Sequence, residues 1–173
     1  MTSLFIKRIF RAIKIDIDLY EEVEKDKSAT LQAGTVVVLS SLAAGVGALQ
    51  MGMSNFLLAP VMSLLSWQVW ASVIYFVILE FFVGPKTNSN HGELLRTIGF
   101  SSAPGLIRVF GVTPELMTVT FIGSAFWMLA CMVVAVKSAL DYESIWKAFG
   151  VVLVAWLFQA LFLLLVLILF KGI

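Results

Sequence analysis

The chain has 173 residues, of which 60% are hydrophobic and 13% are charged. A soluble domain has about 25% charged residues, and a compact soluble body of this size needs them to cover its surface. The net charge of +1 and the single cysteine, Cys131, exclude a broad basic surface for nucleic acid, a disulfide framework and a cysteine-pair zinc site. The composition therefore indicates one domain that is surrounded mostly by lipid.

Four apolar runs are long enough to cross a bilayer as helices. A hydrocarbon core of about 30 Å needs about 20 residues at about 1.5 Å per residue. A charge at mid-membrane costs roughly 2.5 to 3.5 kcal/mol, and these runs contain one charged residue, Glu80, three positions from the end of its run. The runs are 31–49, 64–83, 117–136 and 148–170. They predict an all-α, polytopic transmembrane helix bundle.

A fifth apolar run, 98–112, is short and interrupted. Its 15 residues reach only about 22 Å as an α-helix, and they include Pro104 and Arg108. A proline in a membrane helix is tolerated where neighbouring helices, hydroxyl groups or water satisfy the freed carbonyl. Arg108 can extend its guanidinium to the headgroup layer. The run either crosses the membrane, which gives five spans, or forms a re-entrant or interfacial hairpin, which gives four.

Residues 1–30 precede the first span and have a different pattern. Apolar side chains recur at three- and four-residue steps from Ile6 to Tyr20, and acidic residues dominate the later turns. The early turns carry basic side chains opposite the apolar stripe, at Lys7, Arg8, Arg11 and Lys14. This predicts one in-plane amphipathic helix over 4–27 on the inner leaflet. It serves either as an anchor that orients the first span or as a docking surface for a soluble partner, and its basic residues are candidate membrane-surface or partner contacts.

The basic residues also orient the chain. Six of the twelve lie before the first span, so the positive-inside rule places the N-terminus in the cytoplasm. Four and five crossings divide the other basic residues equally well, so the charge pattern does not decide the side of the C-terminus.

The segment 84–93 is a polar, turn-rich loop with the only histidine of the chain. His91, Glu93 and Arg96 are further candidate surface or partner contacts, and Gly92 and Glu93 are expected to begin the next helix. Glu93 and Arg96 are spaced as an i,i+3 ion pair, worth about 0.2 to 0.5 kcal/mol in a solvated helix. No metal site is expected, because there is no second histidine and Cys131 lies mid-span.

Polar residues inside the spans are candidates for helix packing or for lining a cavity. Gln159 lies at the centre of its run and needs a hydrogen-bond partner on a neighbouring helix. Glu80 either reaches the interface or pairs with Arg96 or Arg108.

Small residues spaced four apart mark the first span, at Ala43 with Gly47 and at Ala44 with Ala48. Such spacing allows close approach of two helix backbones. The partner helix is either in the same chain or in a second copy.

Three segments resemble a known family. The first is the amphipathic lead-in, the second is 93–100 together with the overlapping Gly99-Phe100-Ser101-Ser102-Ala103-Pro104, and the third is 139–148. The second is similar to a Gly-Tyr-x-x-x-Pro pattern with Phe100 in place of tyrosine. The third is similar to the stretch that leads into a last helix. Through these features the chain resembles the Yip (Ypt/Rab-GTPase-interacting protein) membrane-domain family, and its short prokaryotic members in particular. The resemblance covers nearly the whole chain.

The resemblance implies five transmembrane helices, a cytoplasmic N-terminus, a place in the bacterial cytoplasmic (inner) membrane, no cofactor and no enzymatic activity. Eukaryotic members bind Rab-type GTPases. Asp18-Leu19-Tyr20 matches only the start of their Asp-Leu-Tyr-Gly-Pro motif, and their long cytosolic N-terminal region is missing. These departures argue against GTPase binding by this chain.

The favoured function is a non-catalytic membrane scaffold that recruits or stabilises other integral membrane proteins or copies of itself. It is favoured because the sequence has no phosphate loop, no paired carboxylates within a span and no nucleophile beside a base. The alternative is a small transporter, channel or lipid-moving protein with a cavity around the third segment. The candidate packing or cavity residues are Glu80, Gly99, Pro104, Arg108 and Gln159. A membrane-embedded enzyme is a third alternative. Membrane lipids are expected partners, and nucleic acid is not.

Overall fold

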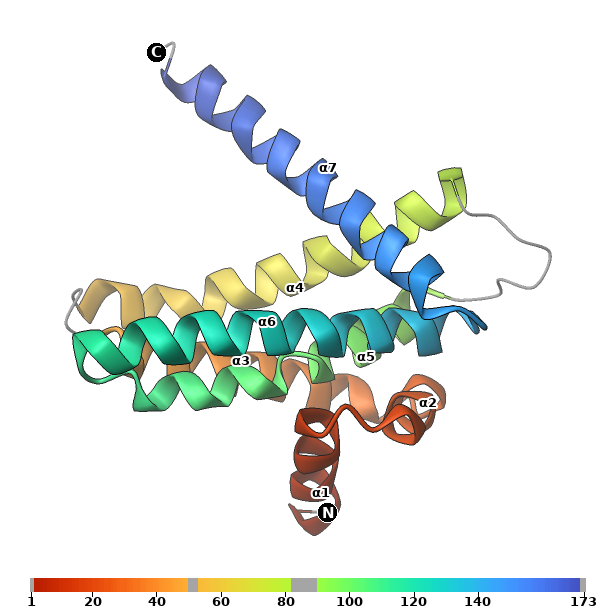
Figure 1. The fold of residues 1–173 in the computed structure, drawn as a ribbon, viewed down its shortest axis with the longest axis horizontal. Helices are drawn as coiled ribbons and strands as arrows, with labels where there is room; N and C mark the ends of the chain where they lie inside the picture. The colour runs from red at the N-terminus through yellow and green to blue at the C-terminus, as the bar shows by residue number, and fades with distance from the viewer. Residues whose placement is uncertain (1, 50–52, 82–89, 172–173) are drawn as a thin grey trace.

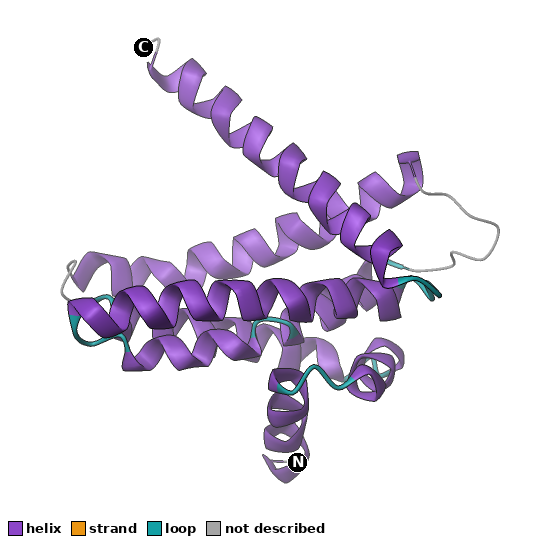
Figure 2. Ribbon diagram, in the orientation of Figure 1, coloured by secondary structure: helices purple, strands orange, loops and turns teal. Residues whose placement is uncertain are grey.

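The computed structural model describes residues 2–49, 53–81 and 90–171, and it describes side chains for 3–49, 60–61, 63–76, 90–158 and 160–161. Every regular element in this part of the chain is helical (Figure 2), so the predicted all-α fold is confirmed there. The elements are α1 (Thr2–Ile13), α2 (Ile17–Lys25), α3 (Ala29–Gly47), α4 (Met53–Phe81), α5 (His91–Phe100), the 3-10 helix η2 (Ala103–Phe110), α6 (Pro114–Ala139) and α7 (Ile145–Lys171).

The long helices form a bundle in which successive segments run in alternating directions. Figure 1 shows α3, α4, the α5–η2 pair and α6 side by side, whereas α7 starts beside α4 and α6 and then diverges from them. The helices α1 and α2 lie on one side of the bundle, and α1 crosses the direction of the bundle helices.

Two apolar clusters hold these layers together. One joins α4, α5, α6 and α7 through buried side chains such as Ile74, Leu94 and Val151. The other joins α1, α2, α3, α5, η2 and α6 and includes Tyr20 and Phe100, both fully buried. The second cluster means that the N-terminal helices belong to the folded core rather than to a detached lead-in.

The predicted single amphipathic helix over 4–27 is wrong, because the chain turns between α1 and α2. Ile15 adopts a left-handed backbone conformation with φ of 58°. The amide of Asp16 then donates to the carbonyl of Arg11 at 3.1 Å, which closes the end of α1. The two short helices can therefore face each other.

The third segment is likewise two helices and not one. The α-helix α5 ends at Phe100, and Pro104 lies in the first turn of η2, where its missing N–H is least costly. The hydroxyl of Ser101 donates to the carbonyl of Ile98 at 2.7 Å beside the break. At about 1.5 Å per residue for α5 and about 2.0 Å for η2, the two helices together extend about 31 Å, close to the thickness of a hydrocarbon core.

Within the described part of the chain, two helices are long and apolar enough to cross a membrane, Ala29–Gly47 and Pro114–Ala139. They correspond to the predicted runs 31–49 and 117–136. The five-span topology stays a prediction.

Two glycines let α3 approach the α5–η2 segment closely. A Cβ atom built on Gly47 would lie 2.0 Å from the carbonyl oxygen of Arg108, and one on Gly99 would lie 2.7 Å from the Cβ of Ala33. Both distances are shorter than a van der Waals contact, so only glycine fits at these backbones. Gly47, one of the small residues marked in the first span, thus packs against a segment of the same chain, and the packing role of the other three stays a prediction.

We predict that Gly47→Ala destabilises the fold by about 1 to 3 kcal/mol, because the new methyl group meets a backbone carbonyl that cannot move alone. The measurement is thermal unfolding of the purified variant in the same detergent as the wild type. The control is Gly123→Ala, since nothing lies within 4 Å of a Cβ built on Gly123. This control should be neutral or gain up to about 1 kcal/mol from helix propensity. Equal stability of Gly47→Ala and the wild type would contradict the close approach.

Candidate functional site

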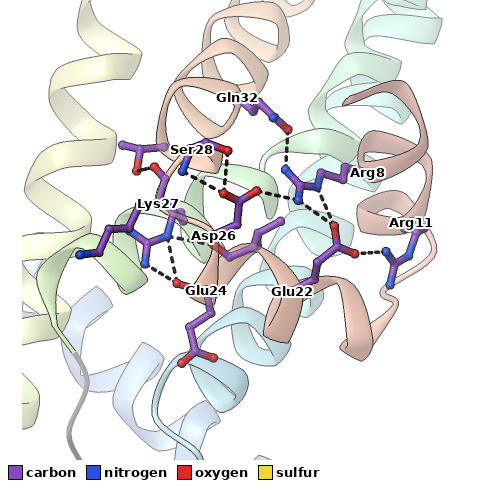
Figure 3. A network of polar contacts seen from close by, with 11 residues as sticks. Arg8, Arg11, Glu22, Glu24, Asp26, Lys27, Ser28 and Gln32 are labelled. Atoms are coloured by element: carbon purple, nitrogen blue, oxygen red, sulfur yellow. Dashed lines mark hydrogen bonds and ion pairs between the residues drawn. The ribbon is translucent and has the colours of Figure 1, made fainter. Parts of the chain in front are cut away.

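A buried arginine joins the N-terminal helices to the bundle. Arg8 of α1 is 4% exposed. Its Nε donates to Oε1 of Glu22 at 2.9 Å, its Nη2 to Oδ2 of Asp26 at 2.8 Å and its Nη1 to Oε1 of Gln32 at 2.9 Å (Figure 3). The partners lie in α2, just after α2 and in α3, so this one guanidinium links three helical segments.

Arg11 extends the same network. Its Nε donates to Oδ2 of Asp16 at 2.7 Å, and its Nη1 donates to the second carboxylate oxygen of Glu22. The hydrogen bond from Arg11 lowers the pKa of Asp16. Burial raises the pKa of Glu22, but the hydrogen bonds from Arg8 and Arg11 outweigh it, so that the pKa is lowered. These carboxylates stay ionised at neutral pH, and the network stays intact there.

The network corrects the prediction that all four basic residues of α1 and its end face a membrane surface or a partner. Arg8 is buried, and Arg11 is half-buried in ion pairs with Asp16 and Glu22. Lys7 and Lys14 are exposed, so their contact with a membrane or partner stays a prediction. The missed partners had a signal in the sequence, since acidic residues crowd the segment that follows the basic ones.

A second arginine fixes α2 against α5. Arg96 is 5% exposed, so it is not the predicted surface contact. Its Nε donates to the carbonyl oxygens of Val23 at 2.9 Å and Glu24 at 3.0 Å, and its Nη2 also donates to Glu24. These carbonyls belong to the last turn of α2, where a positive charge is stabilising.

The expected ion pair between Glu93 and Arg96 is wrong, because Glu93 closes the start of α5 instead. The amide of Asn90 donates to Oε2 of Glu93 at 2.8 Å, and the amide of Glu93 donates to Oδ1 of Asn90 at 3.1 Å. This reciprocal capping box satisfies two free backbone donors of the helix. The helix starts at His91, as the sequence predicted to within a residue or two.

His91 packs against α4. Its Nε2 lies 3.1 Å from the hydroxyl of Ser72 and 3.3 Å from Nε2 of Gln68, and its ring meets the edge of Tyr75 at 6.1 Å between centroids. Within the described residues no group of three or more His, Cys, Asp or Glu is placed to hold a metal ion. Most of the polar loop 84–93 lies outside these residues. The partner contacts predicted for His91 and Glu93 stay predictions.

Arg108 turns into the bundle and not outward to the headgroup layer as predicted. Its Nε donates to the hydroxyl of Ser124 on α6 at 2.7 Å, and its guanidinium carbon lies 5.3 Å from the centre of the Phe121 ring, a cation–π distance. Sequence reasoning missed Ser124, although a serine within an apolar run is a signal for a buried hydrogen bond.

Arg108 borders a cavity between α3, α4, the α5–η2 segment and α6. The cavity has a volume of about 470 Å³, and an adjacent hollow of about 670 Å³ reaches toward α7. Both are lined by Trp70, Arg108, Met128 and Met132. A cavity beside the proline-interrupted segment therefore exists, and Arg108 is its one charged lining residue among those described.

The other candidate packing or cavity residues are placed differently. Gly99 and Pro104 are buried, Gly99 against α3 and Pro104 in the first turn of η2. Glu80 and Gln159 lie in α4 and α7, but their side chains fall outside the described part of the chain. The packing roles of these two side chains stay predictions.

This fold defines a class of protein, an all-α bundle of apolar helices with charged helices held at one side. The family model that matches is the Yip1 domain, over residues 20–167. That range contains most of the chain, so the protein belongs to the Yip1 domain family, and the resemblance in the sequence is confirmed. Family membership and the apolar helices together indicate a membrane protein. No curated protein and no solved structure matches the chain.

Glu24 gives the fold a pH dependence. Burial, with the nearby charges of Asp141 and Glu93, raises its pKa from 4.5 to about 7. Its side chain points away from the arginine network in Figure 3. Because the folded chain binds this proton more tightly than the unfolded chain, the stabilisation from this group is complete below pH 4.5 and is lost as the pH rises through about 7.

We predict that Glu24→Gln stabilises the protein at pH 8 and leaves its stability at pH 5 nearly unchanged, because the amide resembles the protonated acid. The measurement is the unfolding temperature of wild type and variant between pH 5 and 8. Glu21→Gln, which removes an exposed charge from the same helix, is the control and should give a smaller gain at pH 8. Parallel pH profiles for Glu24→Gln and the wild type would refute the assignment.

Proposed function

We propose that this protein is a non-catalytic integral membrane protein that assembles with other membrane proteins, or with copies of itself, through the outer face of α7. The observation that supports this proposal most strongly is an uncovered apolar stripe on a helix that leaves its own bundle.

The helix α7 has two contrasting faces. One packs into the bundle with Ala148, Val151, Val152 and Ala155 buried among α4, α5 and α6. The opposite face presents large apolar side chains that are 44% to 78% exposed, namely Trp146, Leu153, Leu157 and Leu161. The three leucines recur every four residues, which is the spacing that packs one helix along another. A second transmembrane helix fits this stripe.

The divergence of α7 leaves room for such a partner. In Figure 1 the C-terminal part of α7 lies away from α4 and α6. Helix association in lipid depends on packing and interhelical hydrogen bonds, because the lipid tails are as apolar as the helices. A helix that makes few contacts with its own chain gains more of this packing from another one.

Five crossings are part of the proposal. The alternating directions of α3, α4, α5–η2, α6 and α7 support it, as does the combined reach of α5 and η2. Six basic residues before the first span support a cytoplasmic N-terminus. The resemblance to short prokaryotic members of the family supports a bacterial cytoplasmic membrane.

The N-terminal helices fit an interfacial position in this orientation. The thiol of Cys131 on α6 donates to the carbonyl of Ala12 at 3.5 Å. Cys131 lies five residues before the inner end of the run 117–136, which corresponds to a depth of about 8 Å. Trp127, nine residues before the same end, donates to the carbonyl of Ile13 at 2.9 Å, so the end of α1 lies about 8 to 14 Å deep, at the lower limit of the interfacial range of about 5 to 10 Å and below it. Exposed apolar side chains on α1, such as Ile6 and Phe10, suit contact with lipid there.

A structural role for the charged residues supports a non-catalytic function. Arg8, Arg11 and Arg96 hold the N-terminal helices to each other and to the bundle. We infer that these residues stabilise the arrangement of the helices and that the chain acts by presenting surfaces to partners.

Site-specific photo-crosslinking in native membranes tests this proposal. A photoreactive phenylalanine at Leu157 or Leu161 should form a protein adduct of defined mass, because these side chains face the partner helix. A mass of twice the chain identifies a second copy, and another mass identifies a different protein.

The control position is Val119, which is 69% exposed and apolar but belongs to α6 and not to the α7 stripe. It should give little or no protein adduct. The proposal is wrong if Leu157 and Leu161 give only lipid adducts, or if Val119 gives the same protein adducts as they do.

A further inference from the structure

Arg108 places a positive charge deep in the bundle. Its partner Ser124 is seven residues into the run 117–136, which corresponds to about 10 Å below the outer end of that run. Charged side chains at such depth are costly, and they commonly pair with a counter-charge or mark a binding site.

The described residues satisfy only part of the hydrogen-bonding capacity of the Arg108 guanidinium. Within the described residues its hydrogen bond runs from Nε to the neutral hydroxyl of Ser124, and its other close contact is the ring of Phe121. No acidic side chain among these residues pairs with it. An arginine carries five N–H donors in a planar fork that suits carboxylate or phosphate oxygens. Within the described side chains no hydrogen bond runs from its two Nη groups to the protein, so these groups can donate to a ligand.

The two hollows beside Arg108 are both mostly apolar, and they differ in the residues that line them. The one of about 470 Å³ brings together the hydroxyl-bearing residues Ser40, Ser41, Ser63, Ser66 and Ser102 with the arginine. These hydroxyl groups and the arginine offer hydrogen bonds to a charged head group in a hollow that is otherwise apolar. The volume falls within the range of about 300 to 1,000 Å³ typical of ligand sites.

The other hollow, of about 670 Å³, is lined by apolar residues apart from Arg108. It opens at the lateral surface of the bundle between α6 and α7. Its lining includes Ile122, Phe126, Leu129 and Trp156, all of them exposed. In a membrane protein these side chains meet lipid tails. A ligand with an apolar chain can therefore enter this hollow sideways from the bilayer.

We propose that this is a binding site for an anionic phospholipid, whose phosphate lies at Arg108 and whose acyl chain lies in the hollow between α6 and α7. The lateral opening and the apolar lining favour a lipid over a free anion. The site requires a membrane location but not the partner assembly proposed above, so each proposal can fail alone.

Tryptophan quenching by brominated lipids tests the site, since Trp70 and Trp156 line the hollow. The protein is reconstituted in phosphatidylcholine vesicles that contain dibrominated phosphatidylglycerol or dibrominated phosphatidylcholine with the same chains. The wild type should bind the anionic lipid at least about tenfold more tightly, as expected for a charge-assisted hydrogen bond. Arg108→Gln should remove the preference, and Arg108→Lys should keep part of it.

Two further variants separate charge from shape. Lys147→Gln removes an exposed positive charge at the start of α7 and should leave the preference unchanged. Ala125→Phe keeps Arg108 but fills the second hollow, and it should reduce quenching by both lipids. Unfolding temperatures identify any variant that fails to fold, and Ala125→Phe and Arg108→Lys then test the site without Arg108→Gln.

Three results would overturn the proposal. Equal quenching of the wild type by both lipids shows that the head group is not recognised. An equal loss of preference in Lys147→Gln and Arg108→Gln shows general surface attraction. Displacement of the brominated anionic lipid by inorganic phosphate shows a site for free anions and not for a lipid.

Discussion

The contact between α3 and the interrupted α5–η2 segment is the constraint on which the rest of the bundle depends. A backbone at membrane depth must satisfy its polar groups without water, and Pro104 prevents a continuous α-helix there. The chain meets both conditions with local bonds, from the amide of Ser101 to Thr97 and from that of Gly105 to Ser102. The narrow η2 that follows then lies directly on the backbone of Gly47.

This contact also positions the charged and hollow parts of the molecule. The η2 helix turns Arg108 inward to Ser124, and both Arg108 and Ser102, which lies at the break, line the cavity. At the other end of the segment, α5 carries Arg96 to the last turn of α2. The α5–η2 segment therefore connects the N-terminal helices to the cavity. Arg96, near one end, binds the last turn of α2, and Arg108, near the other end, lines the cavity.

Much of the fold could be predicted from the sequence because lipid imposes a simple rule. An uncharged run of about 20 residues has few alternatives to a helix, and α3 and α6 confirm the runs 31–49 and 117–136 to within a few residues. The two errors have local causes. Ile15 adopts a left-handed backbone conformation, and the sequence gives no sign of it because glycine is the residue that usually marks this conformation. The η2 segment was missed because hydropathy does not distinguish a 3-10 helix from an α-helix.

The site was harder to predict because its partners are far apart in the sequence. The acceptors of Arg8 lie 14 to 24 residues away, and those of Arg96 lie more than 70 residues away. The sequence pattern indicated the arginines but not the inward direction of their side chains. The capping box at Asn90 and Glu93 was within reach, since Asn-x-x-Glu is a known helix start. Arg108 was proposed as a packing or cavity residue because a charged group in an apolar segment is costly unless it has a partner or a function, and it lines the cavity.

The most direct test of the membrane bundle is the side of the membrane that two loops face. Thr113→Cys lies between η2 and α6, and Ser144→Cys lies between α6 and α7, each in a Cys131→Ala background. With five crossings and a cytoplasmic N-terminus, an impermeant maleimide should label position 113 in intact cells and position 144 only after permeabilisation. The reverse pattern would contradict a third crossing by α5–η2, and labelling of both positions from one side would contradict the bundle itself.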